Sequence, residues 1–153
     1  MVQNKQDPDL LHSLINKISF NAVDVSISIR RKHVLLVWIN SVIEKEKRRL
    51  AYLSLNFCSD KYLLKINRKY LNHMNFTDII TFDLSENKDI VGDVYISIER
   101  VRNNSRIYKK KYSEELERVI IHGVLHLCGY KDKTQEEISL MRKKEGYYLS
   151  LLE

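Results

Sequence analysis

The chain has 153 residues, of which 44% are hydrophobic and 30% are charged. This balance is typical of one soluble globular domain, and the low count of four glycines and one proline excludes a collagen-like or low-complexity chain. A formal net charge of +6 favours a polyanionic partner if the excess gathers on one face, although a well-solvated surface explains so modest a surplus equally well.

Nothing in the sequence indicates export or insertion into a membrane. The two cysteines, Cys58 and Cys128, lie within apolar runs and show no regular spacing, which favours a reducing compartment. The first residues lack the continuous apolar core of a signal peptide, and no run reaches the roughly 18 apolar residues of a membrane span. We therefore expect a cytoplasmic protein with one domain over residues 1–153, frayed at about its first eight residues.

The first predicted elements are a strand and a long helix. Residues 21–29 alternate with period two, which predicts a strand that buries Ala22, Val25 and Ile27 or their neighbours. Residues 32–50 carry apolar side chains at intervals of three and four, which predicts an amphipathic helix. We interpret the basic cluster near its end as an exposed helix terminus rather than an RNA contact. The cluster consists of Lys45, Lys47, Arg48 and Arg49.

Three further strands and a short helix follow. Residues 52–58 are apolar, aromatic and alternating, which predicts a strand, and Ser59 or Asp60 then caps a short helix. Residues 77–84 and 91–98 flank the turn-rich stretch SENKD, so we expect two antiparallel neighbours.

Three helices are predicted to close the chain. Ser97 caps a helix through about Lys110, and Ser113 with the glutamates after it opens the next. Thr134 and Glu137 form a capping box for the last helix. The expected fold is α+β: a small, mostly four-stranded mixed sheet packed with about five helices, one of which is a zincin-like metal helix.

Two histidines lie four residues apart on the helix expected to begin at Ser113. His122 and His126 share one face, with Cβ atoms about 6 Å apart, so their imidazole nitrogens can bind one ion. Gly129 can adopt the left-handed conformation that ends a helix, so the chain can turn back and deliver Asp132 beside them. This donor set suits zinc or a similar divalent ion, and three protein ligands leave a position open for water. We therefore expect one divalent metal ion, zinc, as cofactor.

Two neighbouring residues limit the chemistry. Cys128 comes two residues after His126, about 200° around the helix, so we expect its sulfur to point away into the core. Gly123 stands where the metalloprotease helix motif has a glutamate as general base, which disfavours peptidase chemistry. Beyond a metal-bound water with a lowered pKa, the sequence assigns no catalytic group. From spacing alone, two surface or core histidines without metal remain the alternative.

Four blocks of this sequence occur in the same order in a known family. The stretch HGVLHLCGYKD, residues 122–132, resembles a His-Gly-x-Leu-His-Leu-x-Gly-Tyr-Asp-His pattern. The blocks TDIITFDL, GDVYISIERV and INRKY are similar to Thr-Asp-Val-Leu-Ser-Phe, Gly-Asp-Ile-x-Ile-Ser and Leu-Asn-x-x-Tyr. Together they cover most of residues 50–150 and resemble the YbeY family of bacterial rRNA maturation factors.

The resemblance implies an α+β fold and a metal-dependent, single-strand-specific endoribonuclease. Its role would be small-subunit rRNA 3′-end maturation and ribosome quality control, with single-stranded RNA and the small ribosomal subunit as partners and no membrane. Asp132 corresponds to the family's third histidine, a substitution that zinc tolerates at some cost in Lewis acidity. The common pattern also has an arginine and Lys-Asp-x-Pro in a region where this chain differs. The residues here are Leu71, His73, Met74 and Phe76.

Three side chains are candidates for RNA phosphate contacts near the metal. They are His73, Lys131 and Lys133, because cations beside a phosphodiester stabilise developing negative charge. A solvated turn explains the two lysines at least as well. Two other functions remain open: a non-catalytic ribosome assembly or RNA-binding factor with a structural metal, and a metallohydrolase that acts on another substrate.

Overall fold

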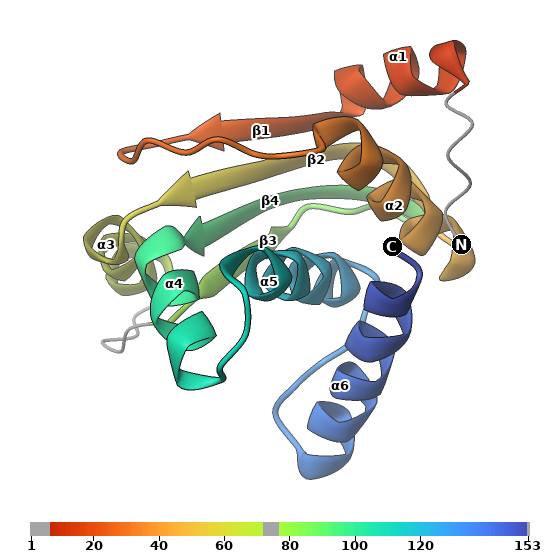
Figure 1. Ribbon diagram of the computed structural model, residues 1–153. Helices are drawn as coiled ribbons and strands as arrows, with labels where there is room; N and C mark the ends of the chain where they lie inside the picture. Colours follow the sequence, from red (N-terminus) through yellow and green to blue (C-terminus); the bar gives the residue numbers. More distant parts are fainter. Residues whose placement is uncertain (1–6, 72–76, 153) are drawn as a thin grey trace.

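A four-stranded mixed sheet forms the centre of the molecule (Figure 1). The computed structural model describes residues 7–71 and 77–152. The strands are β1 (Ile18–Ala22), β2 (Arg49–Cys58), β3 (Ile79–Asp83) and β4 (Asp89–Ser97). They lie in the order β1-β2-β4-β3, with β1 and β4 parallel to β2 and β3 antiparallel to β4. The predicted mixed sheet and the antiparallel pair at its edge are thereby confirmed.

Six helices accompany this sheet within the described ranges, which confirms the α+β class. They are α1 (Pro8–Lys17), α2 (Lys32–Lys45), α3 (Asp60–Leu71), α4 (Ile98–Ile107), α5 (Tyr112–Leu127) and α6 (Gln135–Ser150). The sequence predicts no element where α1 lies, although Pro8 stands in its first turn and Asp7 caps it. None of the helices in the described part of the chain combines the length and the apolar character that crossing a membrane requires.

Polar caps begin three of the helices where the sequence predicts them. The hydroxyl of Ser59 accepts the backbone N–H of Tyr62, and the hydroxyl of Ser97 caps α4 in the same way. Thr134 and Glu137 form both hydrogen bonds of a capping box at the start of α6. The expected cap at Ser113 is wrong, because α5 already begins at Tyr112 and its cap residue makes no side-chain hydrogen bond.

The sequence pattern predicts the first strand at the wrong position. Only Asn21 and Ala22 of the predicted range 21–29 belong to β1, and Ala22 is exposed. Val25 and Ile27 are half-buried against the core, so the alternation is real. Ala22 is already paired with Phe57, one residue before β2 ends. The rest of the segment therefore lies beyond the end of β2 and forms no strand with it.

The predicted helix over residues 32–50 is too long. α2 ends at Lys45, and the chain turns through Lys47, which adopts a left-handed φ of 62°, before β2 begins. Arg49 therefore lies on a strand and pairs with Asp89 of β4 at 2.9 Å. The basic cluster therefore spans the end of α2, the turn and the start of β2, and is not a helix terminus alone. No glycine or proline in the sequence marks this turn.

One face of the sheet packs against α2 and α5, and α6 lies against α5 (Figure 1). Leu53, Leu55 and Phe57 of β2 are fully buried in this layer. Trp38 of α2 is also fully buried, and its indole N–H donates to the carbonyl of Tyr148 in α6 at 2.8 Å. Each large side chain buried here contributes roughly 1.5–3 kcal/mol, so the layer holds α5 firmly.

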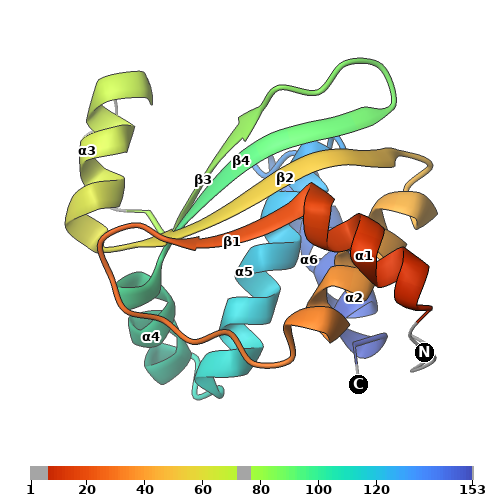
Figure 2. The ribbon, with the colours of Figure 1, turned by 90° about the horizontal axis from the view of Figure 1, so that it is seen from above.

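The opposite face of the sheet is mainly polar. α3 covers only one end of it, as Figure 2 shows, through the small apolar cluster of Cys58, Leu63, Ile66 and Ile80. Across the neighbouring strands, polar side chains bond to one another, for example Ser54 to Asp93 at 2.6 Å. This open face is the side away from α5.

Candidate metal centre

α5 lies close to the sheet because two glycines have no side chain at the contact. A Cβ atom at Gly123 would lie 2.8 Å from Cδ1 of Ile79, and one at Gly92 would lie 2.7 Å from Cδ2 of Leu127. Both separations are shorter than real Cβ contacts. Gly123 thus faces the sheet, and a larger residue there would push the helix and both predicted histidine ligands away from β3.

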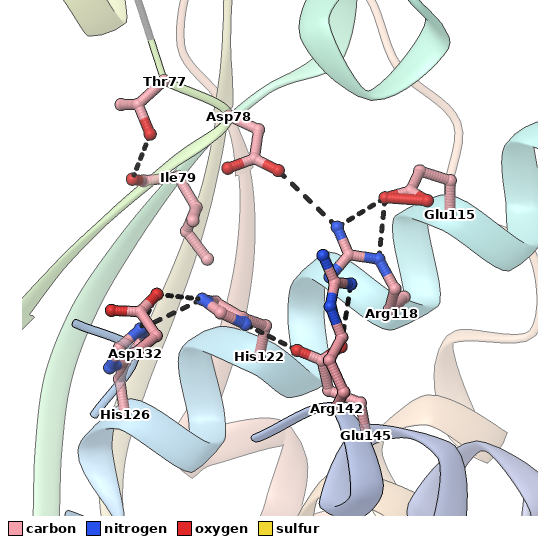
Figure 3. Close-up of polar contacts among 10 residues, drawn as sticks. All are labelled: Thr77, Asp78, Ile79, Glu115, Arg118, His122, His126, Asp132, Arg142 and Glu145. Carbon is pink, nitrogen blue, oxygen red and sulfur yellow. Dashed lines mark hydrogen bonds and ion pairs between the residues drawn. The ribbon is translucent and has the colours of Figure 1, made fainter. Parts of the chain in front are cut away.

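The end of α5 directs the chain back toward its own last turns. Gly129 has a φ of +109°, which favours glycine, and its N–H donates to the carbonyl of His126 at 3.0 Å. The N–H of Tyr130 donates to the carbonyl of Leu125 at 3.0 Å, which completes a Schellman motif. The turn expected at Gly129 is therefore present, and it brings Asp132 beside the helix (Figure 3).

Nitrogen and oxygen atoms of His122, His126 and Asp132 converge on one point. The two Nε2 atoms are 3.0 Å apart, and each lies 3.2 Å from Oδ2 of Asp132. Ligand atoms of a tetrahedral zinc ion, each about 2.0–2.2 Å from the metal, are separated by about 3.3–3.5 Å, close to this triangle. Within the described part of the chain, these three residues are the one group of this kind that could hold a metal ion.

The hydrogen-bond partners of both Nδ1 atoms favour the tautomer with a lone pair on Nε2. Nδ1 of His126 lies 2.9 Å from the carbonyl oxygen of Tyr130, and Nδ1 of His122 lies 2.6 Å from a carboxylate oxygen of Glu145. Since both partners are acceptors, each neutral ring carries its proton on Nδ1 and a lone pair on Nε2. Two lone pairs and a carboxylate oxygen about 3 Å apart repel one another unless a cation lies between them, so the donor set fits a metal.

A buried ionic network supports His122 from behind (Figure 3). Glu145 is only 2% exposed, and its other oxygen accepts from Arg118 at 3.2 Å. Arg118 also bonds to Glu115 at 2.6 Å and lies 3.7 Å from Asp78. Burial acts to raise the pKa of Glu145, but the hydrogen bond with His122 and the charge of Arg118 outweigh it and lower that pKa. Glu145 is therefore an anion at neutral pH.

A second support holds the loop that carries Asp132. The hydroxyl groups of Tyr130 and Tyr148 both donate to Glu46, which also pairs with Lys144 at 3.0 Å. Glu46 directly follows α2, whereas Lys144 and Tyr148 lie on α6. This cluster joins the end of α2 and the helix α6 to Tyr130, whose carbonyl orients His126.

A cleft of about 790 Å³ opens in front of the three converging atoms. β3 forms one wall, the loop after α5 another, and Asn67 and Leu71 of α3 also line it. The predicted phosphate contacts Lys131 and Lys133 line this cleft and are exposed. His73, the third predicted contact, lies outside the described residues.

Cys128 does not join the site, in agreement with the sequence prediction. It packs against the hydrophobic core, and burial raises the pKa of its thiol to about 12. A thiol in this state is a poor metal ligand.

Sequence reasoning missed the supporting residues Glu145, Arg118 and Glu46. One signal for Glu145 was present, because it shares the helical stripe of Met141 and Tyr148, where an apolar residue is expected. A carboxylate in such a stripe requires a buried partner. No comparable signal marks Arg118 or Glu46, since their partners come from distant segments.

Comparison with known proteins agrees with this architecture. The sequence model of the family described as "Endoribonuclease YbeY" matches residues 17–153. The Flavobacterium psychrophilum protein named "Endoribonuclease YbeY" is 49% identical over 88% of this chain and 95% of its own length. Those of Karelsulcia muelleri and Cytophaga hutchinsonii, with the same name, are 52% and 47% identical, over 75% and 88% of this chain and 82% and 94% of their own lengths.

The fold has a counterpart among solved structures. The solution structure of TM1509 from Thermotoga maritima superimposes with a TM-score of 0.57 at 23% identity, over 88% of each chain. The match to the family model and the high identity to its members agree with the block order seen in the sequence. The chain therefore belongs to the endoribonuclease YbeY family.

Proposed function

We propose that this protein is a metal-dependent endoribonuclease that cuts single-stranded RNA during 3′-end maturation of small-subunit rRNA and in ribosome quality control. The cytoplasm is its proposed location and the small ribosomal subunit its proposed partner. The observation that carries the proposal is the convergence of His122, His126 and Asp132 at 3.0–3.2 Å, in a member of a family of endoribonucleases. These three residues are the proposed ligands of one divalent ion, most simply zinc.

Each ligand has a distinct task. His122 and His126 present Nε2 lone pairs, and their Nδ1 protons are held by Glu145 and by the carbonyl of Tyr130. Asp132 is 41% exposed at its side chain and brings the negative charge that favours a divalent ion. A bound ion supplies Lewis acidity toward a phosphoryl oxygen and lowers the pKa of a water molecule.

Two lysines place positive charge at the cleft beside the proposed metal ligands. Lys131 and Lys133 flank Asp132 in the sequence and line the same cleft, so we propose them as contacts to the phosphates beside the cut. His73 is proposed as a third contact on the sequence argument alone. Among the described residues no side chain is assigned as general base, and the cleft carboxylates Asp78 and Asp83 lie on the β3 side.

A structural metal in a non-catalytic assembly factor is the competing hypothesis. Structural zinc sites are usually closed by four protein ligands. Here three ligands lie at the wall of an open cleft, and the third of them is exposed. This arrangement favours the enzyme.

Replacement of one proposed ligand tests the function. We expect His126→Ala to abolish cleavage of a single-stranded rRNA-like substrate by the zinc-loaded protein while circular dichroism stays native. His33→Ala, which removes an exposed histidine that does not line the cleft, is the matched control and should cut like the wild type. Undiminished cleavage by His126→Ala would overturn the proposal.

A further inference from the structure

One cluster of positive charge lies on α3. This helix carries four cations and one carboxylate, a net charge of +3, which is half of the formal +6 of the whole chain. The cations recur at intervals of four, three and one residues, so they share one face of the helix. They are Lys61, Lys65, Arg68 and Lys69, and all four are exposed.

These cations are not neutralised by their surroundings. The one carboxylate of α3, Asp60, is engaged by Arg100 of α4 at 2.9 Å. Between described residues, the structure gives none of the four an ion pair. Together with Leu64 they line a groove of about 480 Å³. An uncompensated basic face of this kind attracts a polyanion.

An exposed aromatic ring lies beside the last of these cations. Tyr70 is 61% exposed, and its ring packs edge-on against Phe82 of β3 at a centroid distance of 5.9 Å. Phe82 in turn contacts Tyr95 of β4 at 6.0 Å, and Tyr95 contacts Tyr62 at 6.3 Å. The ammonium of Lys69 lies 5.2 Å from the centre of the Tyr70 ring. Tyr70 is thus a supported and largely exposed ring, on which a base can stack.

The same helix reaches the metal cleft. Asn67 and Leu71 line that cleft, and Arg68 lies next to Asn67 in the sequence and one turn before Leu71. Exposed cations, an exposed ring and an adjacent metal cleft match the needs of a single strand, whose bases are free to stack and whose backbone carries negative charge.

We propose that the basic face of α3 is a track for single-stranded RNA that leads into the metal cleft. The phosphates lie along Lys61, Lys65, Arg68 and Lys69, and one base stacks on Tyr70. The track rests on the proposed nuclease function, because it supplies the substrate to that site. It gives α3 a role separate from the metal ligands.

Charge removal on α3 is the direct test. The variant in which all four cations become glutamine should bind a short fluorescent single-stranded RNA at least about tenfold more weakly, with chelator present to prevent cleavage. The slope of log Kd against log salt should fall by about 3, since each phosphate contact contributes about 0.7 for a single strand. In zinc-loaded protein, KM should rise while kcat stays within about twofold.

A matched variant at the turn between α4 and α5 controls for bulk charge. In this variant four exposed cations are changed to glutamine, which removes the same charge as in the α3 variant. They are Arg106, Lys109, Lys110 and Lys111, and none of them lines the metal cleft. Both variants should unfold at the same temperature as the wild type. Equal loss of binding by the two variants, or none by the α3 variant, would overturn the track.

Stacking on Tyr70 is tested in parallel. Tyr70→Ala should weaken RNA binding about tenfold with little change in the salt slope, whereas Tyr108→Ala, at the control turn, should not. The outcomes separate the two proposals. A wild type that binds through α3 but cuts no RNA overturns only the proposed function, and a wild type that cuts RNA with unchanged KM in the α3 variant overturns only the track.

Discussion

His122 is oriented by a carboxylate from another helix. Glu145 accepts from Nδ1 of His122 with one oxygen and from Arg118 and Arg142 with the other. Both oxygens therefore face donors, and only a carboxylate can satisfy them together. The buried charge is tolerated because the cations around it stabilise it.

We expect Glu145→Gln to weaken zinc binding about 10- to 100-fold, the usual effect of losing such a supporting group. The amide must turn its NH₂ group either toward Nδ1 of His122 or toward Arg118, and either contact sets donor against donor. Competition with a chromophoric chelator measures the zinc Kd. Arg142→Gln is the control, because Arg142 is exposed and 3.4 Å from the same carboxylate. A wild-type Kd for Glu145→Gln would show that the network does not act on the metal.

Two glycine substitutions should change stability in opposite directions. Gly92→Ala should lower the free energy of unfolding by about 1–3 kcal/mol, because its Cβ would lie 2.7–3.3 Å from three side-chain atoms of buried Leu127. Gly146→Ala should raise it by up to about 1 kcal/mol, since Gly146 is in mid-helix with nothing near its missing Cβ. Urea unfolding measures both. Equal stability of the two variants would mean that Leu127 moves aside without cost.

At the scale of elements, the sequence was informative where one segment carries the whole signal. The His122 and His126 spacing, the Gly129 turn and the capping box at Thr134 are local, and the structure contains all three. The stretch 24–29 alternates as a strand does but pairs with no strand in the described part of the chain, because ladder pairing depends on where another strand ends. The support from Glu145 was hidden for the same reason, since 23 residues separate it from His122. The likeness of α5 to the metal helix of zincins stays a prediction.

Glu46 joins three elements at one carboxylate, so its loss should loosen the metal loop. Burial acts to raise the pKa of Glu46, but hydrogen bonds from Tyr130, Tyr148 and Lys144 outweigh it and bring that pKa below its ordinary value of 4.5. Its stabilisation is therefore complete above that value and disappears as the pH falls through the lower folded-state pKa. Glu46→Gln should cost about 1–3 kcal/mol at neutral pH.

Unfolding by denaturant at neutral pH and near pH 3 measures this effect. The difference between wild type and Glu46→Gln should shrink in acid, as Glu46 becomes protonated and loses its charge. Glu44→Gln is the control, since Glu44 is exposed at the end of α2 and, among the described residues, accepts only from Asn40, at 3.3 Å. A difference that grows as the pH falls would contradict the assignment.

At the scale of the whole molecule, the metal site and the hydrophobic core are separate. The core lies between the sheet and the helices α2 and α5, whereas the three ligand side chains face a cleft and are 16–41% exposed. Two of the largest buried side chains, Trp38 of α2 and Tyr148 of α6, come from helices that contribute no ligand. We therefore expect the fold to form without a bound ion.

Metal removal should consequently separate activity from folding. Dialysis against a chelator is expected to abolish RNA cleavage, to leave the far-ultraviolet circular dichroism unchanged and to lower Tm by only a few degrees, as loss of a ligand that binds the native state requires. Added zinc should restore cleavage and Tm together. Unfolding on chelation would instead identify the ion as structural, because a protein unfolds on metal removal only when the free energy of metal binding is needed to stabilise its fold.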